Sequence, residues 1–164
     1  MFIKKDLIAV IVLILAVGMF VPVAQAQRLD VEFTVCQAIT YNVVHNTPEA
    51  GIVTYDSKAI IQGTKESKVF DNWTAQGVGV VKRIGDKIST YGLAKRMAPD
   101  GEFIIWELHE ESGSEAIWKP IYGTGKWKGI KGEVKGKKFT TGKPIIPGTD
   151  QFCANYIGWI EVPK

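Results

Sequence analysis

The feature that most constrains the fold is a regular succession of strand-like runs and turns in the second half of the chain. From Ala75 onward, runs rich in Val, Ile, Tyr, Phe and Trp are separated by glycine, proline and polar residues. Such runs bounded by turn residues are typical of β-strands, and no window after residue 26 carries a convincing helical stripe of apolar residues. The sequence therefore predicts an all-β protein.

The turns divide this half of the chain into strands. Gly85-Asp86, Pro99-Asp100-Gly101 and Ser112-Gly113-Ser114 are turn sequences, because proline presets φ and glycine accepts positive φ. Together with a further turn expected at Gly136-Lys137, they predict strands over 76–84, 87–97, 102–110, 115–122, 126–134, 138–141 and 152–162. Earlier strands are expected over 29–44, 52–55 and 58–63, while 70–74 is ambiguous. Consecutive strands joined by tight turns are antiparallel neighbours.

Two cysteines mark the ends of this β-domain. Cys36 lies in the first expected strand and Cys153 in the last. In an oxidising compartment an even pair is expected to form one disulfide; two separate buried thiols are the alternative. A disulfide requires Cα atoms within about 7 Å, so it would place the first and last strands side by side. Because a long meander either closes or leaves exposed edges, the cysteines favour a closed antiparallel barrel of about eight strands over a sandwich.

The first 26 residues have the layout of a secretory signal peptide. Two lysines precede an almost wholly apolar run over 7–23, and Ala24-Gln25-Ala26 follows it. A basic start, an apolar middle and a small-x-small end are the parts of a cleavable signal. An uncleaved membrane anchor is the alternative, although the run is near the lower limit for crossing a bilayer. We therefore expect cleavage after residue 26, a secreted or periplasmic single-barrel domain over 27–164, and no stable membrane anchor afterwards.

Charge and composition narrow the function classes. Without Lys4, Lys5 and Asp6, the 20 basic and 17 acidic residues of the chain leave a net charge of +2, too small an excess to predict a nucleic-acid partner. Two cysteines and two distant histidines, His45 and His109, lack the spacing of zinc ligands, so neither a metal site nor a cofactor is expected. No serine stands in the G-x-S-x-G frame of a nucleophile elbow.

A glycine- and lysine-rich stretch over 123–138, GTGKWKGIKGEVKGKK, allows three interpretations. A P-loop is excluded by spacing, because Lys131 stands where its first glycine should be, and Lys128 occupies the third glycine position of a dinucleotide fingerprint. The lysines alternate between strand faces, and lysine on exposed strands usually keeps β-proteins soluble, so a dedicated basic patch is disfavoured. Glycines on both sides of Trp127 fit a strand that bends or lies close to a neighbouring backbone.

The same stretch carries a family resemblance. The pattern G-T-G-x-aromatic-x-G-x-x-G over 123–132 resembles the glycine-rich strand of allene oxide cyclase-like and dirigent-like β-barrels, and the strand rhythm over 75–134 agrees with it. The resemblance implies an eight-stranded antiparallel barrel, often trimeric, with an apolar pocket for a small hydrophobic molecule. Such cyclases hold a reactive substrate in one conformation while a polar group or water stabilises charge. No motif for their polar residues is found in this chain.

Two groups of residues are candidates for ligand binding: polar residues that share a strand face with apolar ones, and the aromatic residues. In the strand expected over 102–110 both faces are largely apolar, which suggests that its outer face is covered by a helix, a loop or another subunit of a homo-oligomer. Glu107 and His109 share one face; if it points inward, Glu107 is a candidate acid or base, whereas a polar strand end is the plainer alternative. The aromatic residues available to a pocket or interface are Tyr91, Trp106, Trp118, Tyr122, Trp127 and Trp159. From both groups we take as ligand-binding candidates Tyr91, Trp106, Glu107, His109, Tyr122 and Trp127.

Three functions are compatible with these features. The leading hypothesis is a secreted barrel that binds a small apolar or amphipathic molecule. A cyclase-like enzyme using Glu107, His109 or Tyr91 is the second, and a structural or interaction protein with a filled barrel is the third. A lumen filled by Trp106 or Trp127 leaves no room for a ligand, whereas one lined by glycine and alanine does. The sequence does not decide which strand parity faces inward, because a single bulge reverses it.

Overall fold

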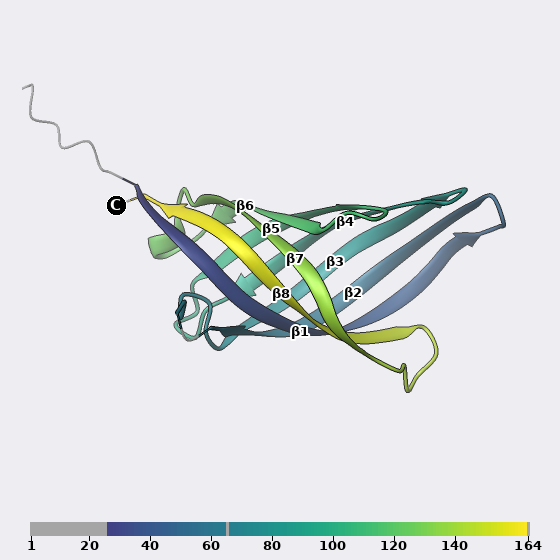
Figure 1. Ribbon diagram of the computed structural model, residues 1–164, viewed down its shortest axis with the longest axis horizontal. Coiled ribbons are helices and arrows are strands. Elements are labelled where there is room, and N and C mark those ends of the chain that lie inside the picture. Colours follow the sequence, from purple (N-terminus) through teal and green to yellow (C-terminus); the bar gives the residue numbers. More distant parts are fainter. Residues whose placement is uncertain (1–25, 65, 164) are drawn as a thin grey trace, which may run out of the picture.

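Eight antiparallel strands form a closed barrel (Figure 1). The computed structural model describes residues 26–64 and 66–163, so the expected signal peptide lies outside the described residues except for Ala26. The elements in chain order are β1 (Gln27–Asn46), β2 (Ala50–Gly63), β3 (Trp73–Ile84), β4 (Lys87–Met97), β5 (Phe103–Glu111), β6 (Ala116–Gly123), the 3-10 helix η1 (Gly125–Trp127), β7 (Lys131–Gly142) and β8 (Thr149–Val162). The predicted all-β class and closed antiparallel barrel are confirmed.

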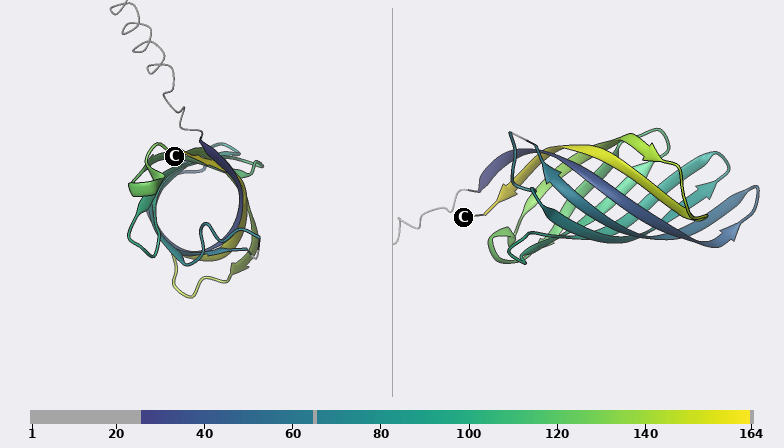
Figure 2. Two further views of the ribbon diagram at one scale, coloured as in Figure 1. Left: turned by 90° about the vertical axis from the view of Figure 1, so that its left-hand side faces the viewer. Right: turned by 90° about the horizontal axis from the view of Figure 1, so that it is seen from below.

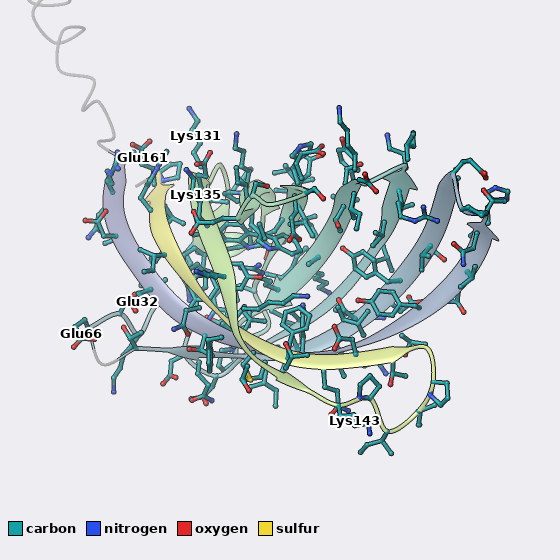
Figure 3. The ribbon with its side chains drawn as sticks, turned by 45° about the vertical axis from the view of Figure 1, so that its right-hand side comes forward. Glu32, Glu66, Lys131, Lys135, Lys143 and Glu161 are labelled. Atoms are coloured by element: carbon teal, nitrogen blue, oxygen red, sulfur yellow. A yellow bond between two sulfur atoms is a disulfide. The ribbon has the colours of Figure 1, made fainter. Side chains whose placement is uncertain are left out.

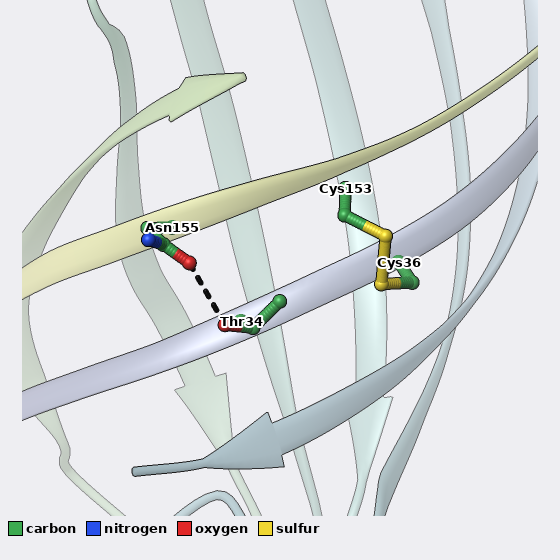
Figure 4. Close-up of a disulfide and its surroundings, with 4 residues drawn as sticks. All are labelled: Thr34, Cys36, Cys153 and Asn155. Carbon is green, nitrogen blue, oxygen red and sulfur yellow. Dashed lines mark hydrogen bonds between the residues drawn. A yellow bond between two sulfur atoms is a disulfide. The ribbon is translucent and has the colours of Figure 1, made fainter. Parts of the chain in front are cut away.

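A disulfide links the first and last strands of the barrel, as the sequence predicted. Cys36 of β1 and Cys153 of β8 are direct partners in the antiparallel register, and their Cα atoms are 4.1 Å apart (Figure 4). Next to the disulfide, the hydroxyl of Thr34 donates a hydrogen bond of 2.8 Å to the side-chain oxygen of Asn155. Cys36 is exposed, so the cross-link lies on the outer surface and leaves the lumen free.

Several element boundaries differ from the sequence prediction. The runs 52–55 and 58–63 form the single strand β2, because Asp56 and Ser57 stay in register with both neighbouring strands. The strand expected over 126–134 is wrong at its start: the chain forms η1 and enters β7 only at Lys131. Gly125 and Gly129 have φ values of +51° and +77°, which bend the backbone away from strand geometry. The turn expected at residues 136–137 is also wrong, since both pair with β8 inside β7.

Alternation of buried and exposed residues shows which side chains face the lumen. In β1, β2 and β3 the buried positions are odd-numbered, and in β4, β5, β7 and β8 they are even-numbered apart from Ser89. In β5 this places Ile104, Trp106 and Leu108 inside the barrel, whereas Glu107 and His109 are exposed. The inward face of β5 is therefore apolar from Ile104 to Leu108.

One end of the barrel is packed with aromatic side chains. Phe70, from the connection between β2 and β3, has its ring centroid 4.8 Å from that of Phe33 and 5.0 Å from that of Trp73. Trp106 and Trp127 complete the cluster, with centroids 6.0 and 6.3 Å from Phe70. Viewed along the barrel, the β2–β3 connection reaches over part of the opening at this end (Figure 2). The tryptophans thus fill only one part of the lumen.

Most lysines of the glycine-rich stretch lie on the outside of the barrel, whereas Lys137 and Lys138 lie at the rim of its lumen. Lys131 and Lys135 are exposed and point away from the lumen (Figure 3), while Lys126 forms ion pairs with Asp100 and Glu102. They interleave with acidic partners rather than forming one basic surface. Over the part of the chain that the structure describes, no helix has the length and apolar character needed to cross a bilayer.

Candidate functional site

A cavity of about 430 Å³ occupies the barrel on the side away from the Phe70 cluster. Every strand contributes to its wall, and the Gly113–Ala116 turn borders its mouth. The apolar part of the wall comprises Ile39, Val81, Leu108, Trp118, Phe152 and Ala154. The polar part comprises Gln37, Tyr41, Tyr55, Ser57, Thr90, Glu110 and Tyr156, with Lys137 and Lys138 at the rim. A hollow of this size whose wall combines apolar side chains with polar groups can hold a small molecule.

Glycines in the wall make room for the ring of Tyr55. Tyr55 of β2 pairs with Gly79 of β3, which pairs with Gly92 of β4. A Cβ atom built on Gly79 would lie 2.5 Å from Cζ of Tyr55, and one built on Gly92 would collide with the Tyr55 hydroxyl. The ring therefore lies flat across two strands where no side chain intervenes, and the lumen beside it stays open.

The tyrosines present neutral hydroxyl groups to the cavity. Burial, together with the nearby Tyr41, Glu110 and Tyr156, raises the pKa of Tyr55 to about 12. Burial also raises the pKa of Tyr41, with smaller contributions from Asp150 and Glu110. Burial raises the pKa of Tyr156 although the charge of Arg96 opposes it. All three hydroxyls therefore remain protonated at neutral pH and can donate hydrogen bonds.

The turn at the mouth places Glu115 beside the cavity, and the acidic group farther inside is Glu110. It follows Leu108 on the inward face of β5 and is half-buried. Burial raises the pKa of its carboxyl group, and the positive charge of Lys138 partly opposes this. A carboxyl group with a raised pKa inside an apolar cavity can exchange a proton with a bound molecule more readily than an ordinary surface carboxylate.

Arg96 lies beneath the cavity floor and is 3% exposed. Its guanidinium carbon is 4.8 Å from the ring centroid of Trp118 and 5.7 Å from that of Tyr156, two residues that line the cavity. Trp106, at 4.7 Å, and Phe33, at 5.4 Å, also surround the guanidinium, and both belong to the packed end. Burial lowers the pKa of Arg96 to about 10, so the group is still charged at neutral pH.

None of the six ligand-binding candidates chosen from the sequence lines this cavity. Tyr91, Glu107, His109 and Tyr122 are exposed on the outer surface. The Tyr91 and His109 rings pack against each other with centroids 4.7 Å apart, and Nε2 of His109 lies 3.2 Å from the Glu111 carboxylate. The remaining two candidates, Trp106 and Trp127, are buried in the packed part of the barrel. Among the aromatic residues noted in the sequence, Trp118 lines the cavity.

The sequence contains a signal for the residues that were missed. Glu110 continues the alternating series Ile104, Trp106 and Leu108, and Arg96 interrupts the small inward series Gly92, Ala94 and Ala98. A single charge at the end or in the middle of an otherwise apolar alternating face is a buried-charge candidate. Within the described residues, no group of three or more His, Cys, Asp and Glu side chains could hold a metal ion.

Comparisons with known proteins relate this barrel to others by structure alone. No model of a known protein family matches the chain, and no curated protein matches it in sequence. Among solved structures, the pterocarpan synthase dirigent protein GePTS1 superposes with a TM-score of 0.56 at 11% identity, covering 89% of this chain and 94% of that one. The fold is that of dirigent proteins.

A second dirigent structure agrees with the first. The pterocarpan synthase dirigent protein PsPTS1 superposes with a TM-score of 0.55 at 14% identity, covering 85% of this chain and 99% of that one. The dirigent-like barrel therefore extends over nearly the whole of both chains. At identities this low, the comparison supports a shared fold and nothing more. The chemistry of the site must therefore be argued from this chain's own residues.

Proposed function

We propose that this protein binds a small amphipathic molecule in its barrel cavity. The observation that carries the proposal is the cavity itself, about 430 Å³ of open lumen above a packed aromatic floor. Its wall combines apolar side chains with a few protonated hydroxyls, a combination that suits a ligand with an apolar body and some hydrogen-bonding groups. The dirigent fold of the barrel supports the proposal as an analogy.

Binding can be tested before the natural ligand is known. Native mass spectrometry of protein purified from its own host should reveal a co-purifying small molecule. In parallel, the neutral dye N-phenyl-1-naphthylamine should gain fluorescence on entering the cavity. Ala116→Trp, in the cavity wall, should weaken dye binding at least about tenfold by filling the site, whereas the control Ala38→Trp, on the exposed outer face of β1, should not. A dye that does not bind, or that binds both variants equally, would contradict the proposal.

A second candidate function is catalysis on the bound molecule. The observation that favours it is Glu110, whose carboxyl group has a raised pKa and lines the cavity with Tyr41 and Tyr55. Such a group could move a proton on a ligand that the walls hold in one conformation. Once a co-purifying ligand is identified, Glu110→Gln should leave its binding intact and abolish any turnover; equal turnover in both proteins would exclude this role.

The proposed setting is outside the cytoplasm. The Cys36–Cys153 disulfide requires an oxidising compartment to form and persist, and β1 begins at Gln27, the expected first residue after cleavage. N-terminal sequencing of the exported protein should begin at or near Gln27. An intact Met1 would contradict the signal-peptide prediction.

A further inference from the structure

The guanidinium group of Arg96 forms the boundary between the packed end of the barrel and the cavity. Arg96 projects inward from β4, and the rings around its guanidinium belong to strands β1, β5, β6 and β8. The side chain therefore reaches across the lumen. Trp106 and Phe33 lie on the packed side, whereas Trp118 and Tyr156 line the cavity, so a molecule that reaches the cavity floor comes next to a positive charge.

This charge has no acidic partner in the described part of the chain. The ion pairs there do not include Arg96, and its Nη1 atom is buried without a hydrogen-bond partner. Buried charges are normally paired, because removing an ion from water is costly. Contacts with aromatic faces offset part of that cost, but a ring face does not replace an acceptor for the N–H groups.

A second unpaired donor lies at the same place. The indole Nε1 of Trp118 is buried without a hydrogen-bond partner among the described residues; it lies close to the Tyr156 hydroxyl without meeting it in hydrogen-bonding geometry. Trp118 lines the cavity and touches the Arg96 guanidinium. Two buried N–H donors, one of them charged, thus lie beneath the cavity floor on side chains in contact with each other, and an anionic acceptor would satisfy both.

We propose that the ligand is an amphipathic carboxylate that binds with its carboxylate group on Arg96 and Trp118 and its apolar body toward the mouth. A carboxylate matches the planar fork of a guanidinium, and its single charge balances a single buried arginine, whereas a dianionic phosphate would leave a charge uncompensated. The reverse orientation would place the carboxylate beside Glu110, which disfavours it by like-charge repulsion. This inference rests on the proposed function, since it requires a ligand in the cavity.

The test compares two competitors that differ only in the head group. Decanoate, which is ionised at neutral pH, and decan-1-ol are titrated against protein loaded with N-phenyl-1-naphthylamine, and displacement of the dye reports occupation of the cavity. Decanoate should displace the dye at least about tenfold more effectively than decan-1-ol, as expected for a charge-assisted hydrogen bond in a buried site. Equal displacement by the two would overturn the inference while leaving the proposed function standing.

Two variants test whether a preference for decanoate over decan-1-ol depends on Arg96 at the cavity floor. Arg96→Met, which keeps much of the side-chain volume, should remove the preference for decanoate and leave the affinity for the neutral dye within about threefold. Arg96→Lys should retain most of the preference, because it keeps the charge. A purely structural role for Arg96 predicts instead that dye and decanoate weaken together, and that outcome overturns the inference.

The rim of the cavity supplies the control. Lys138 borders the cavity and is exposed, so it could attract anions without any contribution from the floor. Lys138→Gln should reduce the decanoate preference by less than about threefold, because an exposed charge at the rim is screened by water. Loss of the preference in Lys138→Gln but not in Arg96→Met would overturn the assignment. Failure of the dye to bind the wild-type protein would remove the proposed function itself, and the inference with it.

Discussion

Two ionisable residues at different depths give the cavity its polarity. Glu110 lies in the wall toward the mouth and Arg96 beneath the floor. Burial disfavours the charged form of each, raising the pKa of the carboxyl group and lowering that of the guanidinium. Since charged residues at buried positions reduce stability unless they are paired, both residues should lower the stability of the ligand-free barrel.

Replacing Arg96 should therefore stabilise the ligand-free protein. Burial lowers the pKa of Arg96 to about 10, a shift equivalent to ~3 kcal/mol against the charged form. Arg96→Met removes this cost but also loses the contacts of the cation with four aromatic rings, so we expect the free energy of unfolding to rise by about 1–2 kcal/mol. Urea denaturation of the ligand-free protein measures it. A marked loss of stability would instead show that the guanidinium serves the core.

Glu110 should make stability depend on pH in the acidic range. Because its folded-state pKa is raised above the unfolded value of 4.5, the folded protein binds the proton more tightly. The resulting stabilisation is complete below pH 4.5 and is lost as pH rises through the folded-state pKa. Glu110→Gln should remove this dependence and raise stability at pH 7 by less than about 1 kcal/mol, since the half-exposed carboxylate is screened by water. Identical pH profiles for both proteins would contradict this prediction.

Among the elements, β3 and β4 determine how much of the lumen stays open. Gly79 and Gly92 are cross-strand partners, and the Tyr55 ring lies over both. Glycine weakens a strand because it offers no side chain to pack, but here the ring from β2 covers the gap. The width of the cavity is therefore set by residues on three adjacent strands acting together.

Adding one methyl group to β4 should disturb this arrangement. A Cβ atom at Gly92 would collide with the Tyr55 hydroxyl, so Gly92→Ala should push the ring into the cavity, lower the free energy of unfolding by about 1–3 kcal/mol and weaken dye binding. Gly142→Ala is the matched control in β7, because its Cβ would meet neighbours only at 3.6 Å or more. Thermal melts and dye titrations compare the two, and equal effects would refute the role of Gly92.

The strand order and barrel closure were predictable from sequence, whereas the site was not. Turns with glycine or proline, such as Pro99-Asp100-Gly101, end strands by their own backbone preferences. The expected disulfide between Cys36 and Cys153 indicates that the first and last strands are neighbours. In β5, however, Phe103 and Ile105 make the outer face nearly as apolar as the inner one, so hydrophobicity alone did not identify the inward parity. The chain's departure into η1 depends on backbone angles that the glycine pattern permits but does not require.

At the scale of the whole molecule, one covalent bond links the first and last strands. The disulfide joins residues 117 positions apart, so in the unfolded chain it closes a loop that contains most of the barrel. In the chain-entropy model such a loop reduces unfolded-state freedom by about 4–5 kcal/mol. The hydrogen-bonded pairing of β1 with β8 remains after reduction, so the barrel should stay closed but become less stable.

Removing the disulfide tests how much it contributes to the free energy of unfolding. The double variant Cys36→Ser, Cys153→Ser should lose about 3–5 kcal/mol of unfolding free energy in urea while keeping the far-ultraviolet circular dichroism of the native barrel. Wild-type protein under reducing conditions should behave like the variant, which separates the bond from the serine substitutions. A loss below about 1 kcal/mol would mean that the unfolded chain retains structure that brings its ends together.

An apolar cluster on the outer wall of the barrel predicts that copies of the protein associate. Val78, Tyr91 and Leu93 form an exposed apolar cluster on β3 and β4, with 51%, 40% and 46% of their surfaces accessible. Apolar clusters of this kind are covered when copies associate, so light scattering should show more than one copy per particle. Leu93→Lys should then give a monomer, because the cluster becomes charged, whereas Ile157→Lys, on β8 and even more exposed at 62%, should not. A monomeric wild-type protein would contradict this prediction and leave the cluster as bare surface.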